Sequence, residues 1–132
     1  MYLLDTNICI YGMKGRYESL TKKLLTIHPD DMAISSVTLG ELEYGAAKSQ
    51  WADRTHMYML TFVSAFNVLP FDDRDALAFG HLRAQLARAG TPIGAYDIMI
   101  AAQALTRNMT LVTHNTGEFQ RVPGLVLEDW VI

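Results

Sequence analysis

Short apolar runs alternate along this chain with longer segments whose apolar residues recur every three or four positions. Runs of three to five apolar residues are typical of buried strands, and the longer periodic segments are typical of amphipathic helices. The runs predict strands at residues 2–4, 32–36, 67–71, 110–113 and 125–127. The periodic segments predict helices at residues 8–13, 17–27, 37–48, 51–66, 72–88 and 97–107, with a tight loop or short helix at 114–119.

Strands that alternate with helices favour a parallel sheet with helices on both faces. The expected fold is therefore α/β, with three layers and a central parallel sheet of about five short strands. We find no internal repeat, low-complexity tract or linker, so residues 1–132 are expected to form a single domain.

The predicted helix at 51–66 has an unusually wide apolar surface. It combines Met57, Tyr58, Leu60, Thr61, Phe62, Val63 and Phe66. The simplest interpretation is that this stripe packs into the core. Its width leaves open that part of it pairs with a second subunit.

Four acidic residues follow strands or begin helices. Asp5 ends the first strand, Glu41 lies one turn into the helix after the second, Asp97 opens a helix, and Glu118 follows the fourth strand. The carboxyl ends of parallel strands meet at one edge of the sheet, which is where such folds bind ligands. We therefore expect all four carboxylates to share a cleft.

Each of these acids also has a structural explanation. Asp5 and Asp97 are suitable helix N-caps, and Glu41 and Glu118 suit a solvated surface. For Glu118 the surface explanation is favoured. For Asp5 and Asp97 we favour function, because both interrupt strongly apolar segments.

Grouping carboxylates is unfavourable: two unit charges 4 Å apart interact by ~4 kcal/mol at an effective dielectric of 20. A shared proton or a cation relieves this repulsion. Oxygen ligands without a Cys or His cluster select hard ions such as Mg²⁺ or Mn²⁺. Bound Mg²⁺ can activate water and bind a phosphate oxygen, which is the chemistry of phosphodiester hydrolysis.

Neutral polar residues accompany the acids. Thr6 and Asn7 follow Asp5, and Thr113 and Asn115 end the fourth strand. Their side chains can orient carboxylates or bound water, although Thr6 is equally suited to a helix cap.

The net charge of −3 argues at first against a nucleic-acid partner. Without the four site acids, however, 10 of the 14 Asp and Glu residues remain against 11 Lys and Arg. A neutralised site would leave a mildly positive surface in the second half of the chain. The candidate contacts with RNA there are Arg83, Arg88, Arg107 and His114.

Two features bear on the cellular compartment: the start of the chain and the length of its apolar runs. The chain begins directly in a strand without a charged leader, and no apolar run approaches the ~20 residues of a membrane helix. The single cysteine, Cys9, excludes an internal disulfide and suits a reducing environment. We expect a cytoplasmic protein without membrane contact, in which Cys9 is buried.

Four ordered segments resemble the successive sequence blocks of PIN-domain ribonucleases, and most closely the VapC toxins of bacterial type II toxin–antitoxin systems. These segments are residues 4–7 (LDTN), 35–45 (SSVTLGELEYG), 92–102 (PIGAYDIMIAA) and 111–119 (LVTHNTGEF). The closing residues, with Val122 to Leu125 and Glu128 to Trp130, fit the same group. The resemblance covers the whole chain in the right order.

The resemblance implies a PIN-like fold and a Mg²⁺-dependent endoribonuclease toxin, with Mn²⁺ as a possible substitute. Asp5 and Asp97 would be the principal metal ligands and Glu41 the third acid. Asn115 stands where many PIN domains have a further acid, and Glu118 follows three residues later. The count of one or two metal ions stays open.

The resemblance also implies partners. A VapB-type antitoxin would place a segment across the acidic cleft, and the toxin would form a homodimer and a hetero-oligomer with its antitoxin. The wording of the third and fourth segments is associated with cleavage of tRNA, in the anticodon region of the initiator tRNA. The alternative is a catalytically weak PIN-like module that mainly binds its antitoxin.

Overall fold

The computed structural model describes residues 1–132 and contains one five-stranded parallel sheet in the order β3-β2-β1-β4-β5. The strands are β1 (Tyr2–Leu4), β2 (Met32–Ser35), β3 (Asn67–Leu69), β4 (Thr110–Val112) and β5 (Leu127–Glu128). The chain thus starts in the centre of the sheet, with Leu4 paired to Ile34 on one side and Val112 on the other. The predicted parallel sheet is confirmed.

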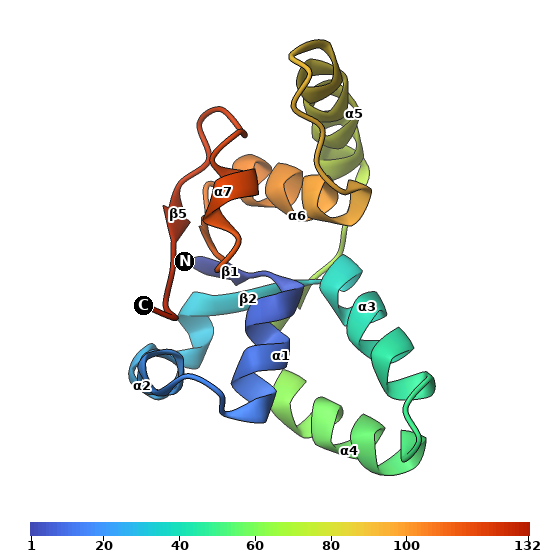
Figure 1. Ribbon diagram of the computed structural model, residues 1–132, viewed down its shortest axis with the longest axis vertical. Helices are drawn as coiled ribbons and strands as arrows, with labels where there is room; N and C mark the ends of the chain where they lie inside the picture. Colours follow the sequence, from blue (N-terminus) through green and yellow to red (C-terminus); the bar gives the residue numbers. More distant parts are fainter.

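Helices cover both faces of this sheet (Figure 1). They are α1 (Thr6–Lys14), α2 (Glu18–Thr26), α3 (Ser36–Ala47), α4 (Ala52–Val63), α5 (Asp73–Arg88), α6 (Ala95–Thr106) and α7 (Thr116–Phe119), with a short 3₁₀ helix at Pro29–Asp31. No membrane-spanning helix is found among them, since none combines the required length with the required hydropathy.

Alternation along the strands divides the core into two halves. Leu3, Ala33 and Leu111 point to the side covered by α5, α6 and α7, whereas Leu4 and Ile34 point to the side covered by α1, α2, α3 and α4. Successive side chains of a strand face opposite sides, so both faces of these strands are apolar and fully buried. This is the three-layer arrangement predicted from the chain pattern.

Most boundaries differ from the predicted ones by one to three residues, and three of these differences have a clear physical cause. β3 ends at Leu69, because Pro70 has no N–H to continue the ladder. α6 begins at Ala95, with Gly94 as its N-cap, so Asp97 lies in the first turn and is not a cap. β5 begins at Leu127, because residues 122–125 form a turn in which Gly124 has a φ of +79°.

The apolar stripe of α4 is divided between core and surface. Met59 and Val63 are buried and pack on the α1 side of the sheet. Met57, Tyr58 and Leu60 are exposed by 65%, 59% and 41%. The simplest interpretation, that the whole stripe packs into the core, therefore holds for only part of it: Phe62 and Phe66 are half-buried against the same core, and the remaining apolar side chains are exposed.

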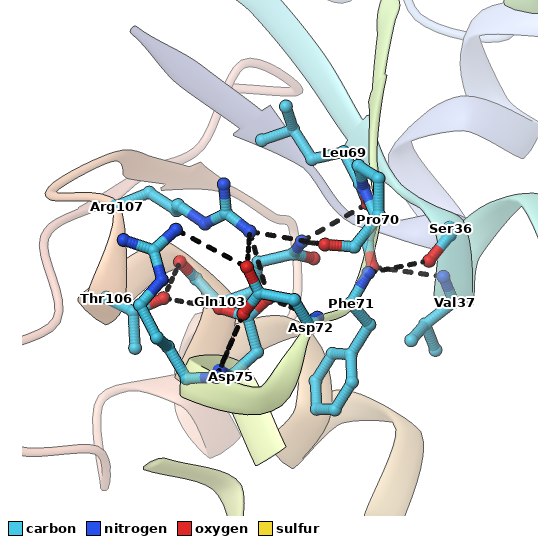
Figure 2. Close-up of polar contacts among 12 residues, drawn as sticks. Ser36, Val37, Leu69, Pro70, Phe71, Asp72, Asp75, Gln103, Thr106 and Arg107 are labelled. Carbon is cyan, nitrogen blue, oxygen red and sulfur yellow. Dashed lines mark hydrogen bonds and ion pairs between the residues drawn. The ribbon is translucent and has the colours of Figure 1, made fainter. Parts of the chain in front are cut away.

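A buried polar network connects the turn after β3 to the carboxyl end of α6 (Figure 2). Asp75 is fully buried, accepts a hydrogen bond from Thr106, and pairs with Arg107 at 3.1 Å. Asp72 and Asp75 also form a capping box at the start of α5. Burial alone would raise the pKa of Asp75, but the bonds from Thr106, the Asp72 N–H and Arg107 lower it below its ordinary value.

Gln103 belongs to the same network and holds the strand end. Its amide nitrogen donates to the carbonyl oxygens of Leu69 (3.2 Å) and Pro70 (3.1 Å). Arg107 donates to Pro70 as well. The network therefore fixes α6, the helix that carries Asp97, against the third strand.

We expect Asp75→Ala to lower the free energy of unfolding by about 3–5 kcal/mol, because it leaves the Arg107 charge without its buried partner. Urea denaturation measures this change. Arg74→Ala is the matched control: Arg74 is exposed and pairs with Asp72 at 3.4 Å, so its loss should cost less than about 1 kcal/mol. Equal costs for the two variants would contradict the role given to the network.

Candidate active site

Asp5 lies at the carboxyl end of the central strand and is only 3% exposed. Its side chain caps α1 by accepting a hydrogen bond from the Ile8 N–H at 2.8 Å. The Thr113 side chain also hydrogen-bonds to it, and its own N–H donates to Val112 of β4. Asp5 is therefore both an N-cap and a buried acid fixed between two strands.

Glu41 approaches the same edge from α3. Its carboxylate accepts a hydrogen bond from the Thr6 hydroxyl at 2.7 Å, and the same hydroxyl lies 3.1 Å from that of Thr38. Thr6 is therefore not the cap of α1, a position that Asp5 occupies; its hydroxyl connects Glu41 to the start of that helix. Thr38 completes this contact, which the sequence analysis missed because spacing does not show which face of α3 meets α1.

Asp97 and Glu118 complete the acidic group. Asp97 lies in the first turn of α6, half-buried and without a hydrogen-bond partner in the protein. Glu118 lies on α7 and accepts a hydrogen bond from the Asn115 side chain at 2.8 Å. Asn115 is in turn fixed through its own N–H, which donates to Thr113 at 3.0 Å.

The electrostatics of these four acids show that they act on one another. The pKa of Asp5 is raised to about 6, mainly by burial and to a smaller extent by the charges of Asp97 and Glu41, against the lowering effect of its bonds to Thr113 and Ile8. Burial, then Glu118 and Glu41, raise the pKa of Asp97. None of the four forms an ion pair with a Lys, Arg or His side chain.

The donor set suits a hard divalent cation, since it consists of carboxylate oxygens without a basic counter-ion. In the present arrangement no three Asp, Glu, His or Cys side chains converge closely enough to ligate one ion together. Glu41 and Glu118 are each drawn toward a neutral neighbour, Thr6 and Asn115 respectively. The four acids therefore lie at one edge of the sheet, where their charges raise the pKa values of Asp5 and Asp97. They do not form a preformed cluster of three metal ligands.

A cleft of about 1120 Å³ begins at this edge. Thr6, Asn7 and Glu41 line its acidic end, and Tyr96, beside Asp97, also borders it. Beyond them the lining becomes largely apolar, with side chains from α1, α3 and α4 such as Ile10 and Met59. Asn7 is exposed and lines the cleft as well.

The four predicted RNA contacts lie in different surroundings. Arg83 and Arg88 are exposed on α5, and Arg83 packs over the Phe79 ring. Arg107 is committed to Asp72, Asp75 and Pro70. Only His114, which directly follows Thr113, is exposed at the carboxyl edge of the sheet.

Comparison with known proteins agrees with this fold and site. A model of the PIN domain matches residues 2–125. The tRNA(fMet)-specific endonuclease VapC of Salmonella typhimurium is 43% identical over 98% of this chain and 97% of its own length, and its namesake from Shigella flexneri is 46% identical over the same shares. The crystal structure of DNA-bound VapBC from Salmonella typhimurium superposes with a TM-score of 0.93, at 43% identity over 98% and 97% of the two chains.

The five-stranded parallel sheet with acidic residues at its carboxyl edge is the arrangement expected for a PIN-domain nuclease, and the family model matches almost the whole chain. The chain belongs to the PIN-domain family, within the group of VapC ribonucleases.

The buried Asp5 predicts a pH-dependent stability. Because the folded chain retains this proton up to a pKa of about 6, against an ordinary 3.8, the contribution of Asp5 to stability falls as pH rises through this window. In EDTA at pH 7 the loss is on the order of 3 kcal/mol. Asp5→Asn keeps an acceptor for Ile8 without the charge, so the variant should be more stable than the wild type at pH 7.

Urea denaturation between pH 4 and 7 measures this difference. The advantage of Asp5→Asn should shrink toward pH 4, where the wild-type carboxyl is protonated in the folded state. An advantage that stays constant across the range, or none at pH 7, would contradict the burial of a charged Asp5.

Proposed function

We propose that this protein is a metal-dependent endoribonuclease, the toxin of a toxin–antitoxin pair, with tRNA as its substrate. The observation that carries the proposal is the buried Asp5, which shares its sheet edge with Asp97 and Glu41 and has no basic partner. Membership of the VapC group supports the reaction class. The names of two relatives, tRNA(fMet)-specific endonucleases, support initiator tRNA as the substrate.

Asp5 and Asp97 would hold Mg²⁺, or Mn²⁺ in its place, with Glu41 as a third ligand. When bound, the cation supplies charge stabilisation at the phosphate and lowers the pKa of a coordinated water. The protein positions its own groups for this: Thr113 orients Asp5, and Thr6 orients Glu41. Asp97, without a protein partner, is free to turn toward the ion.

Asn115 and Glu118 have complementary roles in this proposal. Asn115 stands at the position of the expected fourth acid, but its amide donates to the Glu118 carboxylate. Glu118 in turn raises the pKa of Asp97. We assign Glu118 as the fourth acid and Asn115 as the residue that positions it.

The antitoxin partner is supported by the VapBC complexes to which this chain is similar. We assign its segment to the cleft that begins at Thr6, Asn7 and Glu41, because a chain placed there covers Glu41 and contacts Tyr96, the neighbour of Asp97. The exposed edge of α4, with Met57, Tyr58 and Leu60, offers apolar surface for a further protein contact in the homodimer or the hetero-oligomer.

Purified protein incubated with bulk tRNA and Mg²⁺ tests the function. We expect site-specific cleavage that EDTA stops, and a loss of about 10³-fold or more in Asp5→Asn and Asp97→Asn, which remove ligands of the activating ion. Asn115→Ala should lose only about 10–100-fold, because it acts on a ligand through a second contact.

Glu43→Gln is the matched control. Glu43 lies on the same helix as Glu41 but pairs with His56 at 2.7 Å, so its activity should equal that of the wild type. Cleavage that survives EDTA or Asp5→Asn would overturn the metal-dependent mechanism. A wild-type chain that binds its antitoxin and cleaves no RNA would instead favour the PIN-like binding module.

A further inference from the structure

His114 is held in a fixed orientation at the carboxyl edge of the sheet. Its Nδ1 lies 2.9 Å from the Asp129 carboxylate, and Asp129 is only 11% exposed. The other oxygen of Asp129 accepts the Val131 N–H at 2.9 Å. The carboxylate is thereby anchored to the chain end that follows β5, and it anchors the imidazole in turn.

Two tyrosines support the same ring. The centroid of His114 lies 6.4 Å from that of Tyr11, at an interplanar angle of 76°, and 6.2 Å from that of Tyr17. Tyr11 and Tyr17 pack edge to face at 5.2 Å. The tyrosines are half-buried against the core, whereas the His114 side chain is 42% exposed. We call His114, Asp129, Tyr11 and Tyr17 the histidine platform.

The platform lies beside the acids. Tyr11 follows Asp5 by six residues on α1, which is about 9 Å along the helix axis. His114 follows Thr113, the residue that hydrogen-bonds to Asp5. An RNA strand whose phosphate lies at Asp5 therefore passes the platform with a neighbouring nucleotide.

We propose that the histidine platform stacks a base of the RNA next to the cleaved phosphate, with His114 as the contact and Asp129 as its positioning residue. This inference rests on the proposed ribonuclease function. An exposed aromatic ring whose rotation is already restricted stacks a base at little entropic cost. The Asp129 carboxylate beside the ring disfavours a phosphate contact, whereas stacking does not depend on a positive charge.

Steady-state cleavage of tRNA(fMet) by the full chain tests the proposal. His114→Ala should raise KM about tenfold, the size of one lost stacking contact, with kcat changed by less than about twofold, because the contact is made equally in the ground state and the transition state. His114→Phe, which retains a stacking ring, should keep a KM near that of the wild type. His114→Asn, which keeps hydrogen bonding without stacking, should behave like His114→Ala.

His28→Ala is the matched control. His28 also lies near a carboxylate, Asp30 at 3.7 Å, but it precedes β2 and so lies at the opposite edge of the sheet. Its KM should equal that of the wild type. Asp129→Ala should raise KM in the wild type and add nothing in the His114→Ala background, because it acts through His114.

Two results would contradict the stacking role of the histidine platform without contradicting the proposed ribonuclease function. One is an unchanged KM in His114→Ala. The other is a pattern in which His114→Asn retains the wild-type KM and His114→Phe does not, since that indicates a hydrogen bond in place of stacking. A wild-type chain that cleaves no tRNA would overturn the proposed function itself.

Discussion

The structure depends on a carboxylate that the fold buries at the end of its central strand. Asp5 caps α1 and meets β4, so it is held by the backbone of the elements that define the sheet. Its burial and the acids beside it raise its pKa, and no basic side chain compensates. A proton on the carboxylate or a bound cation offsets this cost, and the proposed function assigns a divalent cation to the site.

The other elements support this edge from both layers. Thr6 links α1 to Glu41 on α3, and Thr113 links β4 to Asp5 and, through Asn115, to Glu118. On the opposite layer, the Asp75–Arg107 network holds α6, which presents Asp97 in its first turn. The four acids thus come from four separate elements of the fold. These elements are held in place by hydrogen bonds between neutral groups and the acids, or by an ion pair distant from the site.

Much of this could be predicted from the sequence, because the signals were local. Asp5 and Asp97 stood out as acids that interrupt apolar segments, and the short strands between helices gave the parallel sheet. Contacts between distant residues left no such signal. The pairing of Arg107 with Asp75 spans 32 positions and gives this predicted RNA contact a structural role as well. Asp129 and Thr38 could not be recognised, since their roles depend on which helix and strand ends become neighbours.

In the proposed function, the acids at this edge of the sheet bind one divalent cation together. Thermal unfolding at pH 7 with increasing Mg²⁺ or Mn²⁺ measures it most directly, because an ion that binds only the folded state raises Tm by mass action. We predict a concentration-dependent rise in Tm for the wild type that is absent from Asp5→Asn and Asp97→Asn. A Tm that does not respond to either ion, or that rises equally in all three proteins, would contradict the account.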